Sequence, residues 1–193
     1  SSDVCSSDLV ERAEVLAELG RFEEAAVGFR AHLARDARDI GVARAYVELL
    51  VYRLNRIDEA FEWLDMLQQQ VPGDVDVRMD RAAALWRANR AREAVDAYLA
   101  VLADWPDRAR AAWNLGLLYF DVIPKNEAEQ RRFWPVARAA FRYFLERSRA
   151  EDADEQFERT LGVPFRLRRI ESLLGASASS AVPALTDLRW PGS

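Results

Sequence analysis

One motif occurs three times and decides the fold: RFEEA at residues 21–25, RIDEA at 56–60 and RAREA at 90–94. The alanines that end them are 35 and then 34 residues apart. Four residues after each alanine comes a large side chain, and a glycine or asparagine stands just before each motif. A fixed period of this length indicates stacked copies of one supersecondary unit.

The boundaries of that unit can be placed from its helix-ending residues. Gly20, Asn55 and Asn89 precede the three motifs, and both residue types tolerate the left-handed conformation that closes a helix. Pro72 and Pro106 follow the second and third motifs, and proline cannot continue a helix. The sequence therefore predicts helices over 9–19, 22–36, 40–54, 57–71, 74–88, 91–104 and 108–121.

The helix before each motif repeats as well. Ala13, Val47, Ala82 and Gly116 follow one another at gaps of 34, 35 and 34 residues. The one extra residue of the second repeat must therefore lie after Leu50 and before Asn55, and we expect it to lengthen a turn without disturbing the packing frame. Small residues let the paired helices approach closely, and about three repeats are needed to bury the apolar faces.

The segment WNLGLLY at residues 113–119 completes a known pattern of Trp, Leu-Gly and Tyr in the first helix, with the tryptophan one place late. Together with the three motifs, it resembles the tetratricopeptide repeat (TPR) family over residues 10–150. The resemblance implies an all-α, TPR-like superhelix (solenoid) of about four helix-turn-helix repeats with a C-terminal helical cap. Such arrays commonly hold a partner protein.

The fourth repeat and the regions beyond it depart from this pattern. An insert near 121–134 carries Asn126 and Glu129, spaced as a capping box, so we expect a helical turn of its own. Pro135 should start or kink the next helix. Residues 151–174 are predicted to form capping helices split by Pro164, and residues 175–193 a disordered tail.

The first nine residues, SSDVCSSDL, match no repeat position. They resemble the translation of a sequencing-adapter oligonucleotide, so we expect residues 1–9 to be artefactual or disordered. In that case the native start and any leader are missing, and cytoplasm and periplasm are not distinguished. The use of arginine almost to the exclusion of lysine favours a GC-rich bacterial genome.

Composition argues against several chemistries. A net charge of -5 offers no basic field for nucleic acid, and no apolar run approaches a membrane-spanning length. One cysteine and one histidine cannot supply the ligands of a structural zinc site, and a serine or cysteine triad would have no base other than His32. No glycine-rich phosphate loop occurs. We therefore expect a soluble protein that is not an enzyme, with no cofactor, no metal and no small-molecule substrate. His32 is interpreted as a buried packing residue.

The resemblance implies that the first helices line a concave groove. Acidic Asp76 and Asp80 stand where some relatives carry a basic clamp for chaperone tails, which argues against that role. The second half of the groove is instead apolar and aromatic, as binding hot spots favour. The predicted partner-binding residues are Tyr52, Met79, Trp86, Arg87, Trp113, Leu117 and Phe120. The alternative is that some of these pack between repeats or lie under the tail.

The function that this pattern predicts is a scaffold that binds an unidentified protein or peptide in its groove. Two other interpretations stay open. The chain could be a non-catalytic fragment of a larger enzyme such as a transferase, or it could self-assemble through exposed end repeats.

Overall fold

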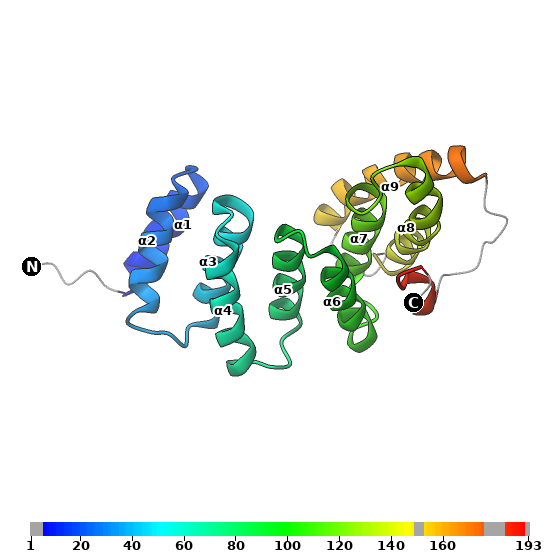
Figure 1. The fold of residues 1–193 in the computed structure, drawn as a ribbon. Coiled ribbons are helices and arrows are strands. Elements are labelled where there is room, and N and C mark those ends of the chain that lie inside the picture. The colour runs from blue at the N-terminus through cyan, green and yellow to red at the C-terminus, as the bar shows by residue number, and fades with distance from the viewer. Residues whose placement is uncertain (1–5, 149–152, 176–183, 192–193) are drawn as a thin grey trace, which may run out of the picture. The chain divides into compact units, whose positions relative to one another are not determined.

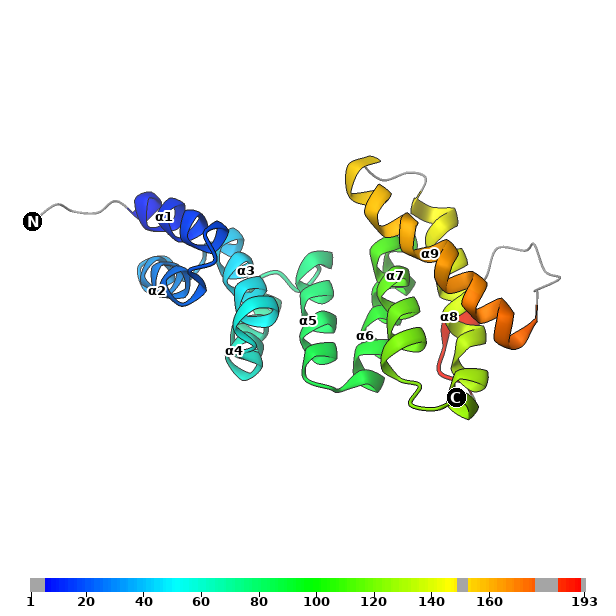
Figure 2. The same cartoon turned by 90° about the horizontal axis from the view of Figure 1, so that it is seen from above.

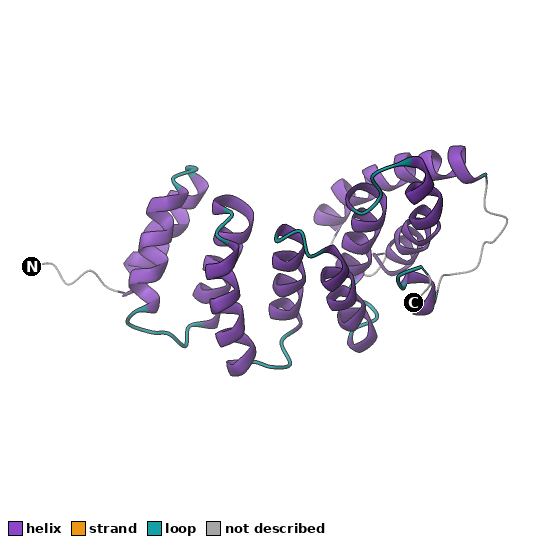
Figure 3. Ribbon diagram, viewed as in Figure 1, coloured by secondary structure: helices purple, strands orange, loops and turns teal. Residues whose placement is uncertain are grey.

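The computed structural model describes residues 6–148, 153–175 and 184–191, and over these residues the chain is all-α. Figure 3 shows helices joined by short loops, without any strand in the described part. The predicted helices up to residue 121 are confirmed, each beginning within three residues of its expected start. In the same ranges no helix is both long and apolar enough to cross a membrane.

Residues 1–89 form one compact unit, in which helices that follow one another in sequence pack against each other. Figure 1 shows them from blue to green. The unit contains α1 (Ser6–Glu18), α2 (Phe22–Leu33), α3 (Ile40–Leu49), α4 (Ile57–Gln70) and α5 (Val75–Arg87). α1 thus begins within the stretch expected to be foreign to the repeat, whereas residues 1–5 lie outside the described residues.

Residues 90–193 form a second compact unit with the same sequential packing. It contains α6 (Ala91–Asp104), α7 (Ala109–Leu117), α8 (Glu127–Arg147), α9 (Ala153–Leu174) and the short 3-10 helix η4 (Leu185–Leu188). Figures 1 and 2 both show α9 lying across α7 and α8. The sequential pairing in both units is consistent with a helical repeat.

The repeat positions have the burial that their residue types predict. Ala25, Ala60 and Ala94 are completely buried. The large residues four positions later, Phe29, Leu64 and Tyr98, are buried as well, and so is Phe141 in the fourth repeat. In that repeat Gly116 lies directly against the Phe141 ring, so that an added Cβ atom would overlap the ring. Small buried residues therefore recur at this position along the chain, and at Gly116 the contact between helices is close.

The ends of the helices repeat too. Gly20, Asn55 and Asn89 have φ values of 76°, 55° and 59°, the left-handed conformation expected of them. Directly after each, an exposed or half-exposed arginine pairs with the glutamate three residues on. These pairs are Arg21–Glu24, Arg56–Glu59 and Arg90–Glu93, with N···O distances of 2.6, 2.6 and 2.5 Å. Each motif therefore starts its helix in the same way.

The extra residue of the second repeat is taken up inside a helix. Leu50–Leu54 form a π-helical turn, η1, which continues α3. A π turn holds one residue more than an α turn, so the packing frame before it is undisturbed. The prediction of an insertion between Leu50 and Asn55 that lengthens a turn is confirmed. A second π turn, η2 (Leu118–Val122), continues α7.

The sequence predicted a separate helical turn in the insert of the fourth repeat. The insert instead lengthens α8 at its start. The Asn126 side chain caps α8 by accepting the Glu129 N–H at 3.0 Å. The Glu129 carboxylate accepts the Lys125 N–H at 2.7 Å, one residue before the position of a capping box. Pro135 lies inside α8 rather than at its start, between the buried Trp134 and Ala137.

Pro164 likewise lies inside α9 and does not split it. A proline in a helix interior costs roughly 3 kcal/mol. Val163 and Ile170 of α9 are completely buried, and burial of two such side chains contributes about 3–6 kcal/mol. Packing therefore outweighs the local preference that predicted two helices.

Residues 184–191 are ordered where the sequence predicts a disordered tail; residues 176–183 of that tail lie outside the described part. η4 contacts α6 and α8, and Leu188 is completely buried. One aliphatic and one aromatic residue in this segment, Leu188 and Trp190, are enough to seat it, although they form no periodic pattern.

Candidate functional site

The predicted groove residues of the N-terminal unit differ in exposure. Tyr52 lies on the π turn η1 and is 46% exposed, and Arg87 is exposed in the last turn of α5. Trp86 is half-buried, whereas Met79 is only 7% exposed and belongs to the core. Of these four residues, Tyr52 and Arg87 therefore present the most surface to another molecule.

An ion-pair cluster that sequence reasoning missed joins α3 to α5. Arg44 donates from Nε to Asp80 Oδ2 at 3.1 Å and from Nη1 to Asp76 Oδ2 at 3.4 Å. The Asp80 side chain is only 12% exposed. Opposite charges about one repeat apart were the signal for it. Two carboxylates here share one arginine, so the cluster has no excess positive charge with which to bind an acidic chaperone tail.

In the C-terminal unit, the predicted aromatic residues pack among themselves. The Trp113 ring lies 5.7 Å from the Phe141 ring and 5.4 Å from the Phe144 ring, between centroids. Phe120 is buried and stacks on Trp134 at 4.9 Å, while the Trp134 Nε1–H donates to the Phe120 carbonyl. Trp113 and Leu117 are half-buried.

Helix α9 lies on this aromatic surface. The Arg166 guanidinium carbon is 5.6 Å from the Trp113 ring centroid and 5.9 Å from that of Phe120. Its Nη2 also reaches Asp121 Oδ2 at 3.5 Å. α9 comes close at Gly162, where an added Cβ would be 3.7 Å from the Trp113 ring. The structure thus brings Trp113 and Phe120 together under a helix of the same chain.

His32 is buried, as predicted, and its role is local. It is 6% exposed, and its Nε2 lies 3.0 Å from Asp39 Oδ2. The other carboxylate oxygen of Asp39 accepts the Val42 N–H and caps α3. That backbone hydrogen bond, more than His32, lowers the pKa of Asp39. Elsewhere in the described chain, too, no three His, Cys, Asp or Glu residues gather as a metal site would require.

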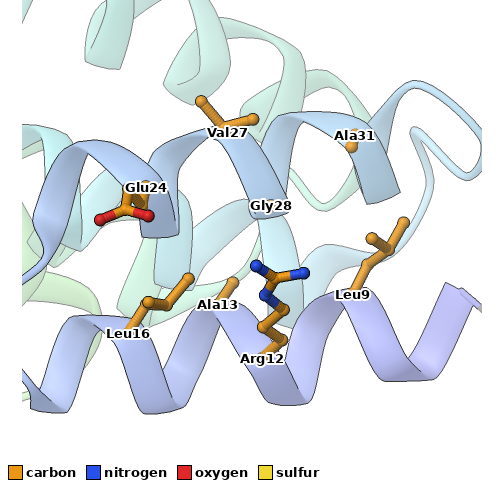
Figure 4. Close-up of a pocket in the computed structure, with 8 residues that line it drawn as sticks. All are labelled: Leu9, Arg12, Ala13, Leu16, Glu24, Val27, Gly28 and Ala31. Atoms are coloured by element: carbon orange, nitrogen blue, oxygen red, sulfur yellow. The ribbon is translucent and has the colours of Figure 1, made fainter.

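A cavity of about 260 Å³ between α1 and α2 is a second feature that the sequence did not predict. Figure 4 shows Arg12 reaching from α1 towards Gly28 of α2, with Leu9 and Leu16 to either side. Its lining is Leu9, Arg12, Ala13, Leu16, Glu24, Val27, Gly28 and Ala31. At Gly28 the two helices are in close contact, since an added Cβ would lie only 2.9 Å from the Ala13 Cβ.

Comparison with known proteins leaves the family open, since no protein-family model matches the chain and no curated protein matches it. Its function must therefore be inferred from its own residues and their geometry.

Proposed function

We propose that the chain is a tetratricopeptide-type superhelix of about four repeats that serves as a protein–protein interaction scaffold and catalyses no reaction. Support for the repeat comes from three buried alanines in register, three helix ends with positive φ, and three equivalent Arg–Glu pairs. The mechanism is reversible capture of an extended or helical segment of a partner protein by the first helices of the repeats.

The observation that carries this proposal is the contact of α9 with Trp113 and Phe120. Both residues belong to the groove set predicted from sequence, and the element that contacts them is an amphipathic helix. A face that accepts a helix of its own chain has the shape and chemistry to accept one from a partner, the helix-in-groove mode of recognition. In this unit, a partner would compete with α9.

In the N-terminal unit, the accessible members of the set are Tyr52 and Arg87. Tyrosine and arginine are enriched at binding hot spots, because each combines a large rigid surface with a polar end. We therefore assign the first contact with a partner segment to these two side chains, with the half-buried Trp86 adding apolar area.

The test is selection of peptides from a display library on the purified chain, followed by affinity measurements with variants. The double change Tyr52→Ser and Arg87→Ser should weaken the selected peptides at least roughly thirtyfold, the effect of losing a hot spot of about 2 kcal/mol. The matched control is Glu62→Ser with Gln68→Ser, two exposed positions on α4 of the same unit, which should leave affinity unchanged.

Circular dichroism would show that all variants keep their helix content. Peptides that bind the Tyr52/Arg87 double variant as tightly as the wild-type chain would refute this assignment.

A further inference from the structure

Residues 184–191 lie on the C-terminal unit much as a bound peptide lies on a receptor. Figure 2 shows this segment, in red, beside α8. Its only regular structure is the four-residue helix η4, where the Ala184 N–H donates to Asp187 Oδ2 at 2.8 Å. η4 contacts α6 and α8, so the surface that receives it is built from helices of the repeat frame.

The main chain of this segment is held by side chains of the receiving surface. Tyr119 donates its hydroxyl to the Leu188 carbonyl at 3.0 Å, and Arg132 donates from Nη2 to the Pro191 carbonyl at 3.1 Å. Burial raises the pKa of the Tyr119 hydroxyl, so that it remains a donor over the whole physiological range. Because every peptide has carbonyl groups, these two contacts do not depend on the side chains of the bound segment.

Two side chains of the segment supply the selectivity. Leu188 is completely buried, and Trp190, two residues on, meets the Phe133 ring edge-on at 5.1 Å between centroids. The Arg92 guanidinium carbon lies 5.3 Å from the Trp190 ring centroid, a cation–π distance. Arg189, between them, has extended backbone (φ -71°, ψ 162°) and an exposed side chain.

We propose that Arg92, Tyr119, Arg132 and Phe133 form a docking site for short segments in which a large aliphatic residue at the end of a helical turn is followed two positions later by an aromatic one. Residues 184–191 are the resident, intramolecular occupant of this site. A partner segment of the same chemistry binds there by displacing them. The site shares no residue with the groove set, so this inference and the proposed function stand or fall separately.

The geometry distinguishes a docked segment from a piece of the core. The helices beneath it have completely buried residues of their own, which are Tyr98 and Val101 of α6 and Ala137 and Phe141 of α8. The segment adds two anchors and two carbonyl contacts to a frame that is already packed. Removing the anchors should therefore empty the site and leave the helices folded.

The experiment uses a labelled synthetic peptide with the sequence of residues 184–191, titrated by fluorescence anisotropy. The receptor is the full chain, either wild type or with Leu188→Ser and Trp190→Ser. The changed chain should bind the peptide at least about tenfold more tightly, because in the wild type a tethered segment competes at an effective concentration of about millimolar. A peptide with the same two serines should not bind.

Further variants locate the binding. In the chain with the emptied site, Arg92→Ala and Arg132→Ala should each weaken the peptide, whereas Arg110→Ala, an exposed position on α7, should not. Equal affinity of the wild-type and changed chains would overturn the proposal, as would a changed chain that keeps its helix content but binds no peptide. The single change Trp190→Ser serves as a milder second variant. Loss of helix content in both would assign the segment to the core and also overturn it.

Discussion

At Gly116, α7 and α8 meet so closely that the smallest possible side chain would overlap the Phe141 ring. Two effects oppose each other at this residue. Alanine favours the helix by about 1 kcal/mol over glycine. Forcing extra volume into a packed contact costs about 1–3 kcal/mol. Because the ring belongs to a completely buried phenylalanine that packs against Trp113 and Phe120, the steric effect should prevail.

Gly116→Ala should therefore lower the free energy of unfolding by up to about 2 kcal/mol in a urea titration. Gly41→Ala is the matched control, since Gly41 lies exposed in the first turn of α3 with no atom closer than 3.5 Å to an added Cβ. There the helix preference acts alone, and the change should stabilise by up to about 1 kcal/mol. The same sign of effect at both glycines would contradict the close contact.

At the residue scale, the sequence alone could not predict the direction in which each side chain of the site points. Met79 was placed in the groove, but it is buried in the core, because one step along a helix turns a side chain by about 100°. Trp113 was placed on the correct helix, yet only the fold reveals that Arg166 lies over it. A contact with a residue 53 positions away cannot be predicted from a local sequence pattern.

At the scale of the element, the π turn η1 lets the helix that begins as α3 hold one more residue without a change in the packing of its buried side chains. The second repeat reads LVYRLN over residues 50–55, and the third reads LWRAN over 85–89. Removal of Tyr52 from the first gives LVRLN, with the length of the second. The extra residue lies beyond the buried Val47 and Leu50, so its loss leaves their positions on the helix unchanged.

Deletion of Tyr52 should therefore change the free energy of unfolding by less than about 1 kcal/mol, within the range of ordinary point changes. Deletion of Glu48, an exposed residue of α3, should abolish cooperative unfolding of the N-terminal unit, because it rotates Leu49 and Leu50 out of the core. Chemical denaturation followed by circular dichroism distinguishes the two. Similar damage from both deletions would mean that η1 is a fixed part of the frame.

Helix starts could be predicted because they depend on local chemistry, such as the Asn126 cap and the left-handed Asn55 and Asn89. The prediction that Pro164 divides α9 was wrong, and of the two alternatives for Pro135, the start of a helix was wrong as well, since the local cost of both prolines is outweighed by burial that only tertiary packing provides. The burial of Leu188 was not predicted for the same reason, since it too depends on tertiary packing.

On the scale of the whole molecule, the chain divides into two units, and within each unit a helix contacts mainly its neighbours in sequence. Stability in such a chain is a sum of local terms, so damage at one site need not spread through the whole. We therefore expect damage in one of the two compact units, residues 1–89 and 90–193, to leave the other unit folded.

Ala60→Leu should destabilise the N-terminal unit by about 1–3 kcal/mol, because Ala60 is completely buried at a helix contact. In native-state hydrogen exchange, amides of α2 to α5 should then exchange roughly five to a hundred times faster, while those of α6 to α8 keep their rates. Ala100→Leu, at an exposed position of α6, should alter neither set. Equal acceleration in both units would show that they open together.

The π turn η1 also bears on how such a chain can diverge. A gene encoding stacked hairpins gains and loses codons at random, and most single-codon changes within a helix would rotate everything beyond them out of register. A wide turn just before the left-handed Asn55 confines that rotation to the residues between the buried Val51 and Asn55, of which Tyr52 and Arg53 are exposed. Lineages can therefore vary in length at this point, and a residue inserted as Tyr52 is lies on the surface, where selection can act on it.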